Sequence, residues 1–397
     1  MVPGILVALG PWEVPPYVGI GVFGLAIWCA ATLLGWAAET SEKDITGSLA
    51  MALLAIVAIL PEYAVDVLLA YKAGSNPAYE PLASANMNGA TRLLIGLALP
   101  LVVLVGVATR RRRAKRAGEE VRRFALFDVL PITPAHRGTM WFLLVGALIA
   151  LTVPLTGQIH VGLGGVLLIV FAVFLWHTGR GEVEEPDLVG VSAYLGAMRR
   201  GPRLFWVVAM FLIAAGTIAT GADPFVESLV ETGTRLHINE ALLIQWLAPL
   251  ASEAPEFIIA LTLAGRGKAA AAVLMLLTSM VNQWTCLVGS LPFAFKLGHG
   301  AGLALPLDGR QVEEFFLTAS VTAVALALLL RLRIPALGAW FMLAVFVAEF
   351  ALPTEHARLI LALVNAAAAA GLTLFGIRHL WPLLKAPFVQ AKPAEAD

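Results

Sequence analysis

Eleven apolar stretches, each about as long as a bilayer-spanning helix, follow one another along this 397-residue chain. A transmembrane helix needs about 20 mostly apolar residues, whereas soluble proteins average about 25% charged residues. Only 14% of this chain is charged. We therefore predict an all-α polytopic membrane protein with about 10–11 spans. The expected spans are 17–38, 46–70, 84–107, 138–156, 159–177, 204–231, 239–264, 269–295, 312–331, 335–352 and 357–378.

Basic residues gather on one side of these expected spans. Excess Lys and Arg are typical of cytoplasmic loops, and the segment 108–137 is the most basic part of the chain. Its basic residues are Arg110, Arg111, Arg112, Arg113, Lys115, Arg116, Arg122, Arg123 and Arg137. We therefore predict a multi-pass protein of the cell (inner) membrane, with loop 108–137 in the cytoplasm and the N-terminus outside. The formal net charge is zero, so nothing suggests nucleic acid as a partner. The lipid bilayer is an expected partner because 59% of the residues are hydrophobic.

Two parts of the chain resemble each other without a gap. The sequence AILPEYAVDVLLAYKAG surrounds Pro61, and ASEAPEFIIALTLAGRG surrounds Pro255. The matches share one offset of 194 residues (256 − 62, 282 − 88 and 285 − 91). Because five spans separate the copies, they have opposite orientations, as in the inverted repeats of many secondary transporters. We expect a first repeat in 1–203, a second in 204–352, and an extra helix with a short tail in 353–397.

A Pro-Glu pair lies inside an apolar stretch in each copy. Glu62 and Glu256 are at matching positions, and an ionisable residue at that depth costs at least about 2.5–3.5 kcal/mol on insertion scales. Proline lacks the N–H donor and clashes with the carbonyl four residues back, so each pair predicts a local helix break. In the second copy Pro249 extends the expected disruption. The freed carbonyls and the carboxylate are together suited to a cation.

The next helix of each copy adds amide and hydroxyl groups. Asn88 with Thr91, and Asn282 with Thr285, are three residues apart and hence on one helical face. Their oxygens and the two carboxylates are hard ligands suited to Ca²⁺ or Na⁺, and two carboxylates balance one divalent or two monovalent cations. One or both glutamates could instead accept protons when the metal leaves. A purely structural role in joining helices is the alternative for these polar groups.

These residues resemble the calcium/cation antiporter superfamily, whose two repeats carry T-S-x-P-E and G-N-x-x-G-S-N stretches. Here ASEAPEF (251–257) is similar to the first and NMNGAT (86–91) to the second. The resemblance implies that Glu62 and Glu256 are the central ion ligands and that Ser252 supplies the hydroxyl before the proline. The family asparagine corresponds to Asn86 or Asn88 in the first copy, and to Asn282 in the second.

The chain departs from that pattern at several positions. Ala58 and Ile59 replace the hydroxyl pair of the first copy, and Glu253 occupies a hydroxyl position in the second. Asp66 lies one turn after Glu62, and Arg92 follows the Asn-x-x-Thr set. We expect Arg92 either to pair with Asp66 or Glu62 or to extend to the membrane interface. The candidate cation ligands are Glu62, Glu256, Asn88, Asn282, Asn86, Asp66, Ser252, Glu253, Thr91 and Thr285.

The residues and the resemblance together predict a secondary active antiporter rather than an enzyme. It would export Ca²⁺ in exchange for Na⁺ or H⁺ by alternating access around Glu62 and Glu256, with these ions as cargo and no cofactor. A Na⁺/H⁺ or other cation/proton exchanger is the alternative within transport; an intramembrane hydrolase and a receptor are the alternatives outside it. Asp223, Glu227 and Glu231, four residues apart, could line an ion entrance or form a solvated helix end.

Overall fold

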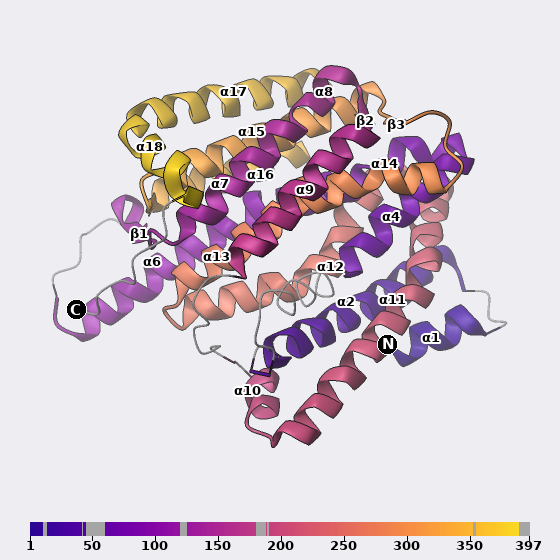
Figure 1. Cartoon of the computed structure of the whole chain (residues 1–397), viewed down its shortest axis with the longest axis horizontal. Helices are drawn as coiled ribbons and strands as arrows, with labels where there is room; N and C mark the ends of the chain where they lie inside the picture. The colour runs from indigo at the N-terminus through magenta and orange to yellow at the C-terminus, as the bar shows by residue number, and fades with distance from the viewer. Residues whose placement is uncertain are drawn as a thin grey trace. The chain divides into compact units, whose positions relative to one another are not determined.

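The computed structural model describes most of the chain as helices that follow the expected spans (Figure 1). The described residues are 1–10, 14–41, 43–44, 60–119, 125–179, 188, 190–351 and 355–388. Ala58, Ile59, the first part of span 46–70 and the C-terminal tail lie outside them. Nine of the described helices are long and apolar enough to cross a membrane. The prediction of an all-α polytopic membrane protein is confirmed.

The first half of the chain alternates long helices with short connecting elements. Its elements are α1 (Val2–Leu9), α2 (Pro16–Ser41), α4 (Leu60–Ser75), η1 (Pro77–Leu82), α5 (Ala85–Arg92), η2 (Leu93–Ala98), α6 (Leu99–Arg116), η3 (Ala125–Phe127), β1 (Val129–Pro131), α7 (His136–Ala150), α8 (Thr152–Thr156), β2 (Gln158–His160) and α9 (Val161–Thr178). The turn η2 is a π-helix inside the third expected span. Such turns are rare and occur frequently at functional sites.

The second half repeats the main elements of the first in the same order, but η1, η3 and α8 have no counterpart among its described elements. Its elements are α10 (Val191–Gly196), α11 (Arg200–Leu236), α12 (Glu240–Gly265), α13 (Ala269–Asn282), η4 (Gln283–Leu287), α14 (Val288–Leu297), β3 (Ala304–Pro306), α15 (Gly309–Leu329), β4 (Arg333–Pro335), α16 (Ala336–Ala351), α17 (Glu355–Phe375), α18 (Ile377–Lys385) and η5 (Ala386–Phe388). The turn η4 is again a π-helix. A short strand precedes α15 and another precedes α16, as β1 and β2 precede α7 and α9. The duplication seen in the sequence is therefore present in the order of the elements.

Two helices extend beyond the expected spans. The basic run Arg110–Arg116 prolongs α6, so the first part of the expected loop 108–137 is helical. The next strand, β1, pairs antiparallel with β4. The other continuous helix is α11, which passes through Pro224 without a break.

The chain divides into two compact units, each containing segments of both repeats. Unit 1 comprises Met1–Ala90, His160–Glu256 and Gly289–Pro306; unit 2 comprises Thr91–Ile159, Phe257–Val288 and Leu307–Asp397. The chain therefore passes between the units inside α5 and inside α12. In unit 1, α2 and α11 lie side by side, and in unit 2 α15 and α17 do so (Figure 1).

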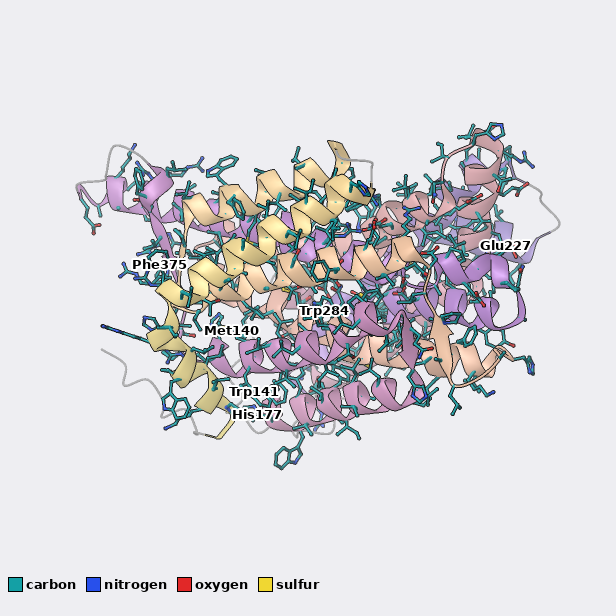
Figure 2. All side chains as sticks on the ribbon, turned by 90° about the horizontal axis from the view of Figure 1, so that it is seen from above. Met140, Trp141, His177, Glu227, Trp284 and Phe375 are labelled. Carbon is teal, nitrogen blue, oxygen red and sulfur yellow. The ribbon has the colours of Figure 1, made fainter. Side chains whose placement is uncertain are left out.

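Each unit has a core of apolar side chains. In unit 1, α2, α4, α11 and α12 share a cluster that includes Phe23, Leu69, Phe225 and Ile244. In unit 2, Trp284 is fully buried and donates its indole N–H to the Thr322 hydroxyl at 3.1 Å (Figure 2). The buried indole therefore has the hydrogen-bond partner that a polar group needs in the interior.

An ion pair in unit 1 joins the end of α2 to the start of α11. Arg203 donates from Nε and Nη2 to the two carboxylate oxygens of Asp44, at 2.6 and 2.5 Å. Its Nη1 donates to the carbonyls of Gly196 and Met198. The hydrogen bonds from Arg203 hold the pKa of Asp44 below its usual value. Arg203 thus ties the segment after α2 and the end of α10 to the start of α11.

Candidate cation-binding site

The two Pro-Glu pairs lie on α4 and α12, but α12 is not broken. It runs from Glu240 to Gly265 with Pro249 and Pro255 inside it, which corrects the expected helix break at this pair. A proline still removes one backbone donor. The carbonyls of Gln245 and Ala251, four residues before the prolines, therefore lose their usual helical partner. The other pair, Pro61 and Glu62, stands at the edge of the described residues, so the helix break expected there stays a prediction.

Three carboxylates converge in unit 1. Glu62 of α4 and Glu253 and Glu256 of α12 each offer an oxygen, and these oxygens all lie within 4.8 Å of one another. Glu62 is 5% exposed and Glu253 is 3% exposed, while Glu256 is partly buried. Such a set of oxygens from two helices suits a hard cation. The structure thus brings together the two repeat-related glutamates and adds Glu253.

Asp66 organises the start of α5 rather than the carboxylate cluster itself. It is fully buried and accepts hydrogen bonds from Asn86 Nδ2 at 2.8 Å and from the Met87 N–H at 3.2 Å. Asn86 is also fully buried, and its Oδ1 has no hydrogen-bond partner among the described residues. A buried acceptor in that state carries a desolvation cost, which a bound cation would relieve. Asp66 therefore fixes the amide of Asn86 so that its oxygen stays available.

The two other candidates of unit 1 bond to backbone carbonyls three or four residues earlier in the chain. Asn88 Nδ2 donates to the Ser84 carbonyl at 3.1 Å. Ser252 Oγ lies 3.3 Å from the Ala248 carbonyl oxygen and 3.4 Å from that of Pro249. Both side chains are buried. With the donors directed to the backbone, the oxygen atoms of both residues keep lone pairs for a cation.

The remaining candidates, Thr91, Asn282 and Thr285, belong to unit 2. All three are buried. The Thr285 hydroxyl donates to the Val281 carbonyl of the preceding turn. Their role as ligands stays a prediction.

A glycine lets α5 approach α12 within unit 1. A Cβ at Gly89 would overlap the carbonyl oxygen of Gln245 and lie 2.7 Å from its carbonyl carbon. That carbonyl is the one deprived of its helical donor by Pro249. The helix that carries Asn86 and Asn88 is therefore seated on the helix that carries Glu253 and Glu256.

We expect Gly89→Ala to impair both folding and ion transport, because two backbones would have to separate. Overpacking of this kind costs about 1–3 kcal/mol, occasionally more. Gly165→Ala in α9 is the matched control, since a Cβ there meets nothing within 4 Å. Thermal unfolding in detergent and Ca²⁺ uptake by proteoliposomes measure the two effects. Equal behaviour of the two variants would contradict the close contact.

Arg92 belongs to an ion-pair network in unit 2 that the sequence analysis missed. Its Nη2 lies 2.5 Å from Glu314 Oε2 and its Nη1 lies 3.4 Å from Glu349 Oε2. Arg358 of α17 pairs with the other oxygen of Glu314. Arg92 is 1% exposed, so the interpretation as an interfacial side chain is wrong. The sequence did contain a signal for this network, because Glu314 and Glu349 lie inside expected spans. The cost of burying an ionisable residue there, which singled out Glu62, applies to them as well.

The acidic residues of α11 have basic partners. Lys72 pairs with Asp223, and its Nζ lies 3.1 Å from Glu227 Oε1. Glu231 pairs with Arg235 one turn later. Both Asp223 and Glu227 are more than half exposed, as in a solvated helix end. Figure 2 labels Glu227 on this helix.

Known proteins match this chain at the level of a family model and at the level of solved structures. Residues 16–179 and 206–352 match the family described as sodium/calcium exchanger protein. No curated protein sequence matches at a significant level.

Among solved structures, a crystal structure of an H⁺/Ca²⁺ exchanger, CAX, is similar over 98% of this chain and 94% of its own, with 32% identity and a TM-score of 0.87. The sodium-calcium exchanger NCX_Mj soaked with 10 mM Na⁺ and 10 mM Sr²⁺ is similar over 86% of this chain and all of its own. Its identity is 17% and its TM-score 0.53, so that likeness concerns the fold alone.

Proposed function

The chain belongs to the sodium/calcium exchanger family, and we propose that it is a secondary active antiporter that moves Ca²⁺ in exchange for H⁺. The observation that carries the proposal is the convergence of Glu62, Glu253 and Glu256 on one point of unit 1. Membership of an exchanger family supports transport over the hydrolase and receptor alternatives.

The number of carboxylates favours Ca²⁺ as the metal cargo. Three ionised carboxylates carry three negative charges, so a divalent cation leaves one and a single monovalent cation leaves two. The donors are oxygens from carboxylates and from buried amide and hydroxyl side chains, which are the ligands that Ca²⁺ takes in proteins. Glu62, Glu253 and Glu256 would hold the ion, with Asn86, Asn88 and Ser252 as further candidates.

The same crowding favours protons as the exchanged ion. Three like charges within 4.8 Å of one another repel strongly in a medium of low dielectric constant once the cation leaves. Protonation removes that repulsion without a further ligand set. Glu253 is the best candidate for the proton carrier, because its repeat counterpart, Ile59, is apolar. The 32% identity with a protein described as an H⁺/Ca²⁺ exchanger supports the proton as the exchanged ion.

The proposed orientation follows from the basic residues. The C-terminal end of α6 and the segment up to Arg137 would face the cytoplasm, and the N-terminus would lie outside. The β1·β4 pairing supports this, because it joins two segments that the charge distribution places on the same side. We place the protein in the cell (inner) membrane.

Proteoliposomes test the coupling ion directly. An acidic lumen should drive Ca²⁺ uptake, because protons leave down their gradient as Ca²⁺ enters, and collapse of the pH gradient with nigericin should abolish it. An outward Na⁺ gradient at equal pH should drive none. Vesicles that contain the Glu62→Gln/Glu256→Gln variant give the background Ca²⁺ uptake that comes from leakage through the membrane. Uptake driven only by Na⁺ would assign Na⁺ as the coupling ion, and proton movement driven by Na⁺ without Ca²⁺ flux would favour the Na⁺/H⁺ alternative.

A further inference from the structure

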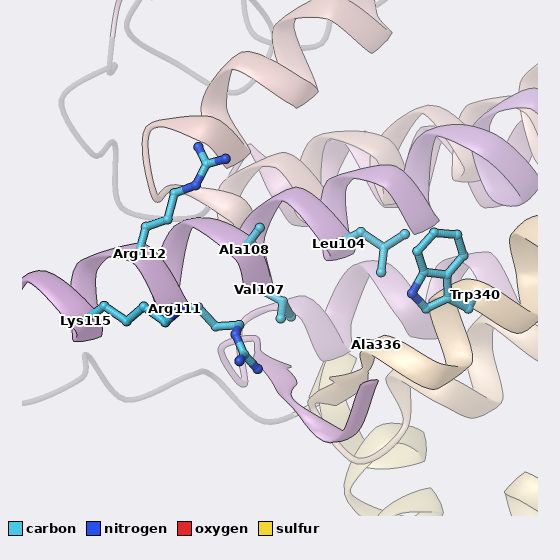
Figure 3. Close-up of a pocket in the computed structure, with 8 residues that line it drawn as sticks. All are labelled: Leu104, Val107, Ala108, Arg111, Arg112, Lys115, Ala336 and Trp340. Atoms are coloured by element: carbon cyan, nitrogen blue, oxygen red, sulfur yellow. The ribbon is translucent and has the colours of Figure 1, made fainter. Parts of the chain in front are cut away.

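A groove of about 350 Å³ lies between α6 and α16 in unit 2 (Figure 3). Its wall on α6 is formed by Leu104, Val107, Arg111, Arg112 and Lys115, and α16 contributes Trp340. The groove is apolar at one end and basic at the other. No residue of the candidate cation-binding site lines it.

The division between the two ends follows from helical periodicity. Leu104, Val107, Arg111 and Lys115 are spaced by three or four residues, so they share one face of α6. The expected span 84–107 ends at Val107, so this face crosses from the hydrocarbon region to the interface. Trp340 is 51% exposed, and half-exposed tryptophans are typical of the membrane–water interface.

The basic end has more positive than negative charge. Arg111 Nη1 lies 2.6 Å from Asp128 Oδ2, so its charge is balanced. Arg112 and Lys115 are exposed, and no carboxylate of the described residues forms an ion pair with either. Three cations against one carboxylate leave about two positive charges at this end of the groove. Two such charges at a membrane surface attract an anion.

We propose that this groove binds a phospholipid with an anionic headgroup. The phosphate would lie between Arg112 and Lys115, and an acyl chain would follow Leu104, Val107 and Trp340 towards the hydrocarbon. Free phosphate matches only the basic end, because it has no apolar part to cover the other. In the orientation proposed above, the lipid comes from the cytoplasmic leaflet, where negative surface potential is concentrated.

Native mass spectrometry of the purified full-length protein tests this with two lipids, phosphatidylglycerol and phosphatidylcholine. The protein should retain phosphatidylglycerol preferentially. Arg112→Gln/Lys115→Gln should weaken that binding by about 25-fold, since each juxtamembrane cation contributes a factor of about five. Arg116→Gln/Arg378→Gln is the matched control, because it removes two exposed cations outside the groove.

A second variant separates a lipid from an inorganic anion. Trp340→Ala should weaken phosphatidylglycerol binding, because it removes the aromatic side chain at the apolar end, whereas a site for a simple anion would not depend on Trp340. Equal retention of both lipids, or equal losses in the two double variants, would overturn the proposal. Displacement of phosphatidylglycerol by millimolar inorganic phosphate would overturn it in favour of a simple anion site. None of these readouts depends on Ca²⁺ transport.

Discussion

Replacing Glu62 or Glu256 by glutamine is expected to lower Ca²⁺ transport by about 100-fold. Glutamine keeps the shape of the side chain and removes its charge, so the variant isolates the electrostatic contribution. Removing one partner of a buried charged contact costs about 2–5 kcal/mol, and 100-fold corresponds to about 2.7 kcal/mol. The loss should appear both in the rate of pH-driven uptake and in the affinity for Ca²⁺ measured by calorimetry.

The control for this prediction is Glu240→Gln in the first turn of the same helix α12. Glu240 accepts a hydrogen bond from the Thr234 hydroxyl at 2.9 Å, and it lies 16 residues before Glu256, or about 24 Å along the helix. This variant should transport normally. If Glu62→Gln and Glu256→Gln also transported Ca²⁺ at the rate of the unmodified protein, the carboxylate cluster would not be the ion site.

Arg92→Met is expected to destabilise the folded protein by about 3–5 kcal/mol. The substitution removes the cation that Glu314 and Glu349 share, and leaves Arg358 and the nearby Arg310 beside Glu314. Removing one partner of a buried ion pair costs that much. Methionine has a similar length, so little packing is lost. Thermal unfolding in detergent measures the change.

Two further variants show whether charge is the cause. Arg92→Met/Glu349→Gln should recover part of the lost stability, because it removes one of the uncompensated carboxylates. Arg235→Met breaks the exposed pair with Glu231, whose side chains are 60% and 52% exposed, and should change stability by less than about 1 kcal/mol. A loss as large in Arg235→Met, or no recovery in the double variant, would contradict a buried ion-pair network.

Much of the architecture could be predicted because the bilayer imposes simple rules on the sequence. Helix length and apolar content located the spans, and α11 and α12 begin within about four residues of the expected positions. The 194-residue offset identified Glu62 and Glu256 as equivalents. Burial cost then singled them out as functional candidates.

The missed features depend on contacts that no local pattern records. Arg92 and Glu349 are 257 residues apart, and the pair has no counterpart in the repeat, because Cys286 occupies the position equivalent to Arg92. Repeat symmetry therefore gave no signal for the network. The prolines of α12 were misjudged for a related reason: neighbouring helices can hold a proline-containing helix in one piece, as membrane helices commonly do.

Helix α11 is too long to lie entirely within the hydrocarbon region of a bilayer. Its 37 residues rise about 55 Å, against a hydrocarbon thickness of about 30 Å, and a tilt of about 20° shortens the projection only slightly. The 21 residues from Arg203 to Asp223 alone match that thickness. The final turns of α11, with Glu227, Glu231 and Arg235, must then project beyond the hydrocarbon region. Their side chains are therefore accessible to water-soluble reagents that do not enter the bilayer.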